Sequence, residues 1–328
     1  MTGAGRLVLL LALLAVALLT GIRVGAVGLT VADILGAFTG TADRATQSIV
    51  LGLRTPRVVL AALCGAALAL SGGTCQALLR NPLADPYILG ISSGAAVGAV
   101  GAVMLGVDDG PTWLLPAAAF AGSLLALMLV LRIATITGEA LDSRILILAG
   151  VVVAAFGNAI VLLFLTFADV ESFRTAMFWM MGSLSGATWT RTATLGVPLA
   201  IAGVLLFGYA RSLDALAIGD TTAAALGVSV ENTKRACFVL ASLLAAVSVS
   251  VSGVVGFVGL ITPHAIRLVW GSDHRFLLPA SALLGASFLV FADLGARSIV
   301  PSTELPLGVV TALVGVPFFV MLLRRRDG

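Results

Sequence analysis

Residues 236–269 read ACFVLASLLAAVSVSVSGVVGFVGLITPHAIRLV, an apolar run with a single charged residue near its end. A membrane-spanning helix needs about 20 apolar residues, so this run is too long for one span. Gly253, Gly256 and Gly259 lie in its middle, and glycine tolerates the backbone conformations of a tight turn. The sequence therefore predicts two helices here, the second of them short and ending near Trp270.

Apolar stretches of the same character recur along the whole chain. They cover residues 7–27, 58–79, 89–106, 113–133, 145–167, 191–210, 277–297 and 307–323. The chain is 59% hydrophobic and 11% charged over 328 residues, whereas about a quarter of the residues of a soluble protein are charged. Because lipid leaves open sheet edges unsatisfied, we expect an all-α polytopic membrane protein with a single transmembrane domain over residues 1–328. Arg6 and the run after it resemble a signal peptide, but the run continues too far for cleavage, so an uncleaved first span is expected.

The distribution of basic loop residues discriminates between nine and ten spans. Ten spans with the N-terminus inside place most of these residues on the inner side. Nine spans would move Arg267, Arg275 and 324–326 to the outer side, against the positive-inside rule. The sequence thus predicts ten transmembrane helices with both chain ends in the cytoplasm.

A weak internal repeat relates the two parts of the chain. Ser71-Gly72, Leu79 and Pro82 recur as Ser252-Gly253, Leu260 and Pro263 at one constant offset, and Gly90 recurs as Gly271. Chance matches among abundant small residues are the alternative. If the repeat is real, the odd number of spans between the copies predicts two inverted five-helix halves, approximately 1–180 and 181–328, as is common in transporters.

The basic residues stand at the ends of the apolar stretches, which is the usual membrane pattern, so no nucleic-acid partner is expected. Cys64, Cys75 and Cys237 lie inside apolar runs without paired spacing and are expected to be core residues. His264 and His274 belong to no cluster of ligand residues, so we expect structural roles for them and no metal site.

Motifs for catalysis or ATP hydrolysis are missing from the sequence. Gly90–Gly94 matches G-x-S-x-G in form, but that motif works on a strand-turn-helix of an α/β sheet, and small residues that open an apolar helix favour close packing. A phosphate loop needs a lysine after a glycine-rich turn, and the only lysine, Lys234, follows Thr233 instead. We expect no enzyme activity and no cofactor on this chain, and any ATP-driven work must come from a partner.

An ion-coupled carrier would need acidic residues at membrane depth. Asp293 is the only acidic residue well inside a span, and Arg297 lies one helical turn away, where the two can pair. An ion-coupled secondary transporter therefore stays open as the alternative function, and an intramembrane hydrolase that uses Ser92 is a third.

Four polar segments interrupt the apolar pattern. Segment 54–57 (RTPR) is a rigid cationic patch suited to carboxylates, and in segment 80–86 (RNPLADP) two prolines prevent a continuous helix. The inner loop 211–235 is expected to form two short helices around Asp220, the second of which ends at Gly227. Residues 302–306 are expected to form a tight outer turn. The loop 211–235 is expected to lie on lipid or to dock a cytosolic partner.

These segments resemble the FecCD-type permeases, the membrane subunits of ABC importers for iron–siderophore complexes, haem and cobalamin. The resemblance is carried by 54–57, 65–72 (GAALALSG), 80–86, 89–95 (LGISSGA), 257–264 (FVGLITPH), 271–275 (GSDHR) and 304–312 (ELPLGVVTA). It implies the type II ABC importer architecture, in which two permease copies surround one translocation path.

The resemblance also implies roles for single residues. In the family, arginines at the positions of Arg54, Arg57 and Arg297 receive glutamates of a substrate-binding protein. The cytoplasmic gate corresponds to Asn81 and Leu83, and a second gate segment to Asp142 and Ser143, where this sequence is shifted by one residue. Helices that couple to the ATPase correspond to Leu216, Gly219, Asp220 and Gly227.

The partners implied by the resemblance are a second permease copy, identical or related, two cytosolic ABC ATPase subunits that bind ATP and Mg, and a periplasmic or lipid-anchored binding protein. The chain would lie in the bacterial cytoplasmic (inner) membrane and carry an iron–siderophore or related metal chelate inward. An iron complex is the expected substrate because it is the commonest in the family.

Overall fold

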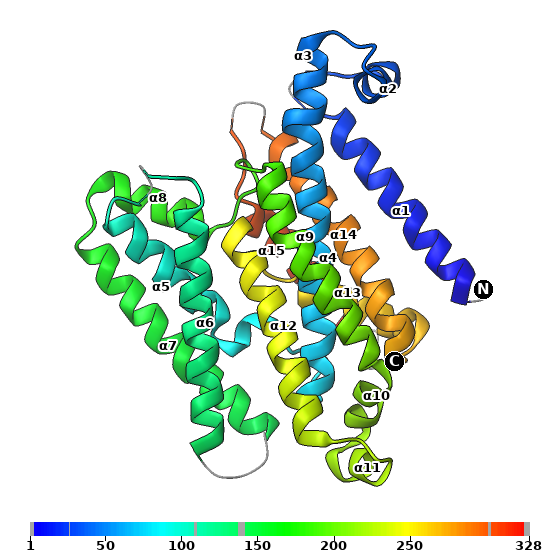
Figure 1. Cartoon of the computed structure of the whole chain (residues 1–328), viewed down its shortest axis with the longest axis vertical. Coiled ribbons are helices and arrows are strands. Elements are labelled where there is room, and N and C mark those ends of the chain that lie inside the picture. Colours follow the sequence, from blue (N-terminus) through cyan, green and yellow to red (C-terminus); the bar gives the residue numbers. More distant parts are fainter. Residues whose placement is uncertain (1–2, 26, 108–109, 137–141, 301–302, 325–328) are drawn as a thin grey trace.

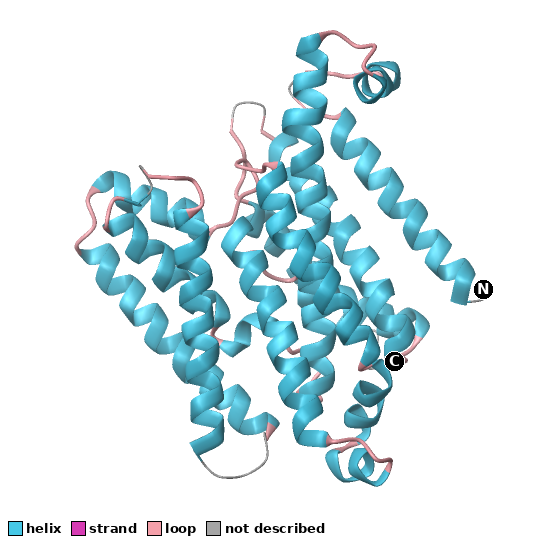
Figure 2. Cartoon of the chain, in the orientation of Figure 1, coloured by secondary structure: helices cyan, strands magenta, loops and turns pink. Residues whose placement is uncertain are grey.

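The computed structural model describes residues 3–25, 27–107, 110–136, 142–300 and 303–324. All regular secondary structure in these ranges is helical (Figure 2). Seven helical segments are long and apolar enough to cross a membrane. They are α1 (Gly3–Arg23), the continuous run of α3 (Arg44–Gln47), η1 (Ser48–Arg54) and α4 (Thr55–Leu78), α6 (Leu114–Ile136), α7 (Ser143–Thr166), α9 (Trp189–Gly208), α12 (Val230–Ser252) and α14 (His274–Ser298). The expected all-α polytopic architecture is confirmed.

The long apolar run 236–269 is divided as the sequence predicts. Helix α12 ends at Ser252, and α13 (Val258–Trp270) begins after a short break. Gly253 has a φ of 68°, a conformation that favours glycine, and so ends α12. The shorter apolar helices α5 (Ile91–Met104) and α15 (Leu307–Arg324) complete the set needed for ten spans. Among the described residues only seven helical segments have full spanning length, so the count of ten stays a prediction.

Short helices occupy the two ends of the bundle. Helix α2 (Val31–Thr39) begins with a capping box in which Thr30 and Asp33 satisfy each other's backbone amides. Helices α10 (Ala210–Ile218) and α11 (Asp220–Ala225) lie at the opposite end (Figure 1). The remaining short helices are α8 (Val170–Met180) and the 3₁₀ turn η2 (Pro86–Leu89).

Helix α4 is the centre of the fold and packs against α9, α12, α13 and α14. Glycines allow two of these contacts. A Cβ on Gly65 would collide with the carbonyl of Gly285 in α14, and a Cβ on Gly72 would collide with the carbonyl of Gly259 in α13. Helix backbones can approach this closely in membranes only where side chains are small.

Helices α5, α6 and α7 form a second group beside this centre, on the left of Figure 1. Gly94 of α5 faces the backbone of Gly122 in α6, and a Cβ on Gly94 would lie 2.5 Å from the Gly122 carbonyl oxygen. The interpretation of the G-x-S-x-G match as a packing element is therefore confirmed.

The repeated Ser-Gly pairs have different surroundings. Gly72 lies inside α4, whereas Gly253 ends α12. The first copy thus lies within a continuous helix, whereas the second copy lies where a helix ends. The arrangement in two inverted halves stays a prediction.

Candidate docking, gate and coupling sites

The three arginines assigned to docking meet at one end of the bundle, here called the arginine end. Arg57 in α4 lies between two carboxylates, with Nη2 2.9 Å from Asp293 Oδ1 and Nη1 2.8 Å from Glu304 Oε1. Arg297 Nε lies 3.3 Å from the other oxygen of Asp293, which confirms the pair inferred from the one-turn spacing in α14. Asp293 is therefore shared by two arginines.

The guanidinium groups of Arg54 and Arg297 bind carbonyls at the end of α1 and in the segment that follows it. Arg54 Nη1 donates to the carbonyls of Ile22 and Arg23 at 2.9 Å, and its Nη2 donates to Val27. Arg297 Nη1 donates to the Val24 carbonyl at 2.8 Å, and its Nη2 donates to the Gly21 carbonyl. The last carbonyls of a helix have no partner within it, so these guanidinium groups satisfy them.

The rigid cationic patch expected of segment 54–57 is largely covered in the structure. Arg54 is only 8% exposed, because α1 folds over it. Glu304 keeps a side chain that is 47% exposed, and its hydrogen bond with Arg57 lowers the pKa of this carboxyl. Arg57 and Glu304 are thus the members of the cluster nearest to solvent.

The two predicted gate segments lie side by side at the opposite end, here called the loop end. Asn81 Oδ1 accepts a hydrogen bond from the Leu83 amide at 2.9 Å, which fixes the turn after α4 and leaves the Leu83 side chain exposed. Asp142 caps α7 by accepting from the Arg144 amide at 2.6 Å, and Ser143 Oγ donates to the Leu78 carbonyl at 2.8 Å. The start of α7 is therefore attached directly to the end of α4.

The loop 211–235 forms the two short helices expected from the sequence. Gly219, with a φ of 150°, separates α10 from α11, and Gly227, with a φ of 82°, follows α11. Leu216 is buried and anchors α10. The exposed apolar side chains of this loop are Ile218 (72%) and Leu226 (67%), which the sequence did not single out.

Asp220 links the loop 211–235 to the predicted gate segment that follows α4. Its Oδ2 lies 2.6 Å from Lys234 Nζ in α12 and 3.8 Å from Arg80 Nη2 at the start of the gate turn. Arg80 has a φ of 49°, an unusual value for a residue with a side chain, so its backbone is held by the surrounding turn. One carboxylate thus lies between α11, α12 and the turn that follows α4.

His274 and the three cysteines have structural surroundings. His274 Nδ1 lies 2.5 Å from Asp214 Oδ1, which joins the start of α14 to α10. Cys64, Cys75 and Cys237 are buried and free, as expected of core residues. Within the described ranges, no three His, Cys, Asp or Glu side chains are grouped closely enough to hold a metal ion.

Comparison with known proteins identifies the family of this chain. The sequence model of the FecCD transport family matches residues 13–325. A cobalamin import system permease, BtuC, of Halobacterium salinarum is 46% identical over 86% of this chain and 75% of its own length. The vitamin B12 import system permease BtuC of Vibrio parahaemolyticus is 42% identical over 86% of this chain and 84% of its own length.

Solved structures give the same result. A metal-chelate type ABC transporter in an inward-facing conformation is 31% identical and superposes with a TM-score of 0.87 over 97% of this chain and 98% of that chain. PsaBC from Streptococcus pneumoniae, at 16% identity and a TM-score of 0.57 over 89% of this chain and 95% of that chain, shares the fold. The resemblance found in the sequence is confirmed, and this multi-pass membrane protein belongs to the FecCD transport family of ABC transporter permeases.

Proposed function

We propose that the chain is the translocation subunit of a binding-protein-dependent ABC importer and that its substrate is cobalamin or a related corrinoid. The observation that carries the proposal is the identity of 42–46% with two permeases named for cobalamin import, over 86% of this chain in each case. This replaces the iron complex expected from family frequency alone. Iron–siderophore and haem uptake are the competing outcomes of the test below.

In this proposal, the loop end faces the cytoplasm and carries the ATPase. The exposed side chains of Ile218 and Leu226 provide apolar contacts for a groove on that partner. Closure of two ATPase subunits on ATP and Mg moves α10 and α11, and Asp220 transmits the motion to Arg80 and the gate turn. The gate residues Asn81, Leu83, Asp142 and Ser143 then change their arrangement together, because Ser143 is bonded to the end of α4.

The arginine end faces the outside and receives the binding protein. Arg54, Arg57 and Arg297 keep their proposed role in docking, but the exposure of the cluster favours Arg57 as the direct contact. A partner carboxylate would take the place of Glu304 on Arg57, since both groups need the same outward face of the guanidinium. Arg54 and Arg297 would then fix the position of that face.

The translocation path is proposed to lie between two permease copies. Helix α7 presents Leu148, Val152 and Phe156 at four-residue intervals on one exposed face. An apolar lining of this kind binds a bulky chelate weakly and so allows it to leave.

The alternative, an ion-coupled secondary transporter, is disfavoured by the surroundings of Asp293. This carboxylate is buried and holds ion pairs with both Arg57 and Arg297. Both of its oxygens already face guanidinium groups, so a transported cation would have to displace an arginine to reach this carboxylate.

The test is reconstitution of the chain into liposomes with and without its cognate ATPase and binding protein. We expect ATP-dependent accumulation of labelled cobalamin only when all three components are present. Ferric siderophore and haem serve as matched substrates under the same conditions. Accumulation by the chain alone along an imposed ion gradient would contradict the proposal, and preference for a ferric siderophore would correct only the substrate.

A further inference from the structure

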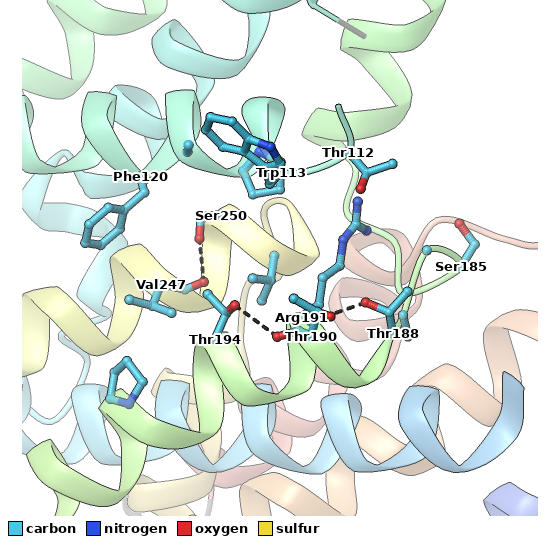
Figure 3. A pocket seen from close by; sticks show the side chains of 16 residues that line it. Thr112, Trp113, Phe120, Ser185, Thr188, Thr190, Arg191, Thr194, Val247 and Ser250 are labelled. Carbon is cyan, nitrogen blue, oxygen red and sulfur yellow. Dashed lines mark hydrogen bonds between the residues drawn. The ribbon is translucent and has the colours of Figure 1, made fainter. Parts of the chain in front are cut away.

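A cavity of about 920 Å³ lies between α6, α9 and α12 at the arginine end (Figure 3). Helices α6 and α9 both pack against α12, so residues of α12 form the floor of the cavity and the other two helices form its walls. The start of α9 lies beside η1, which leads into α4, because Trp189 Nε1 donates to the Leu51 carbonyl at 3.0 Å. The volume is that of a pocket for a sizeable organic ligand.

Among the described residues that line this cavity, Arg191 is the charged one. Its side chain extends from the first turn of α9 toward Thr112 (Figure 3). Within the described part of the chain, its guanidinium has no hydrogen bond or ion pair, in contrast to Arg54, Arg57 and Arg297 nearby. A half-buried guanidinium without an acceptor favours an anionic ligand, and phosphate oxygens match its fork of donors.

The local sequence makes room for this guanidinium. A Cβ on Gly186 would lie 2.5 Å from Arg191 Nη1, so only glycine at this position allows the observed side-chain position. The Thr188 hydroxyl accepts from the Arg191 amide at 3.2 Å and caps α9. The guanidinium therefore lies beside the start of a 20-residue helix, where the helix dipole also favours negative charge.

The side of the cavity away from Arg191 is apolar. Phe120 of α6, Pro198 of α9 and Val247 of α12 line it. Trp113 also lines the cavity, and tryptophan is typical of the membrane–water interface. Beyond the cavity, exposed Val197 and Ile201 continue the apolar surface of α9. The site thus combines one anion-binding group at its polar end with an apolar surface that extends along membrane-spanning helices.

We propose that this cavity binds an anionic phospholipid of the surrounding bilayer, with its phosphate on Arg191 and acyl chain along Phe120, Pro198 and Val247. A soluble anion would use the arginine but leave the apolar walls without a ligand. An uncharged lipid would use the walls but leave the guanidinium without an acceptor. The bound lipid would fill the space between α6 and α9, whatever substrate the chain carries.

The test is titration of the purified full-length chain, in a neutral detergent, with phosphatidylglycerol or phosphatidylcholine of the same acyl chains, followed by native mass spectrometry. We expect one phosphatidylglycerol to bind at least about tenfold more tightly than phosphatidylcholine, the effect of about one charge-assisted contact. Arg191→Met should remove this difference, and Gly186→Ala should weaken binding although the charge is kept. Arg174→Met, which changes an exposed arginine on α8, is the matched control and should bind as the unchanged chain does.

Three results would overturn the proposal. Equal binding of the two lipids would show that the cavity does not recognise an anionic headgroup. Displacement of phosphatidylglycerol by inorganic phosphate would identify a free anion as the occupant. Unchanged lipid binding in Arg191→Met, with the helical circular dichroism of the unchanged chain, would place the lipid elsewhere.

Discussion

The charged side chains at the two ends of the bundle differ in how many helices they connect. At the arginine end, Arg54, Arg57 and Arg297 have their donors taken by Asp293, Glu304 and the last carbonyls of α1, so that α1, α4 and α14 are tied together. At the loop end, a single partly exposed carboxylate, Asp220, joins α12 to the gate turn. The first arrangement fixes helices relative to one another, whereas the second can transmit a displacement. We infer that the arginine end is the rigid part and the loop end the moving part.

The largest expected effect is on the stability of the arginine end. Asp293→Ala would remove the buried carboxylate that the partly buried Arg57 and Arg297 share, and removing one partner of a buried ion pair costs about 3–5 kcal/mol. We expect a marked fall in the midpoint of thermal unfolding in detergent. A midpoint within a degree of the unchanged chain would show that the cluster does not hold these helices together.

The next effect concerns the contact surface of the loop end. Leu226→Asp puts a charge on an exposed apolar side chain, and loss of its burial in an interface costs about 2 kcal/mol, or roughly thirtyfold in affinity for the ATPase. The matched control is Ile299→Asp, which changes an equally exposed apolar residue at the arginine end. If both variants, or neither, lost the ATPase in a co-purification titration, the assignment of the loop end would be wrong.

A smaller effect is expected for the connection between the coupling loop and the gate. Asp220→Asn removes the charge that faces Arg80 and Lys234 and should lower uptake per ATP hydrolysed by about tenfold, within the usual range of coupling free energies. Binding of the ATPase should stay unchanged, because the exposed residues Ile218 and Leu226 are kept. Equal losses of uptake and of ATPase binding would instead indicate that α11 has lost its structure.

The smallest effect is expected from Glu304. Its exposed ion pair with Arg57 should contribute at most about 1 kcal/mol, so Glu304→Gln should shift the unfolding midpoint little at neutral pH. Because the pKa of Glu304 is lowered in the folded state, this contribution is complete above the ordinary value of 4.5 and is lost as the pH falls through the lowered value. The difference between the two proteins should therefore vanish in acid; a difference that grows in acid would contradict the ion pair.

Much of the fold could be predicted because lipid imposes simple rules on sequence. Apolar runs gave the long helices, and the glycines after Ser252 gave the division between α12 and α13. The segment 30–54 was missed because α2 and η1 are too short or too mixed for a span. The T-x-x-D pattern of Thr30 and Asp33 was the one local signal that could have revealed α2, since it forms a capping box.

In the candidate sites, only contacts between residues close in the sequence could be predicted. The one-turn spacing of Asp293 and Arg297 predicted their ion pair. The ion pair of Arg57 with the same carboxylate depends on how α4 packs against α14, which the sequence does not show. The burial of Arg54 depends on the path of α1, which no motif records. In the loop 211–235, most positions of the short helices are apolar or small, so the sequence could not show that Leu216 points inward and Leu226 outward.

The central claim is that the two ends face opposite sides of the membrane and serve different partners. Single-cysteine labelling with a membrane-impermeant maleimide tests it directly, since Cys64, Cys75 and Cys237 are buried. We expect Leu226→Cys to react only in inside-out vesicles and Ile299→Cys only in intact spheroplasts. Labelling of Leu226→Cys from the outside of intact spheroplasts would contradict the account.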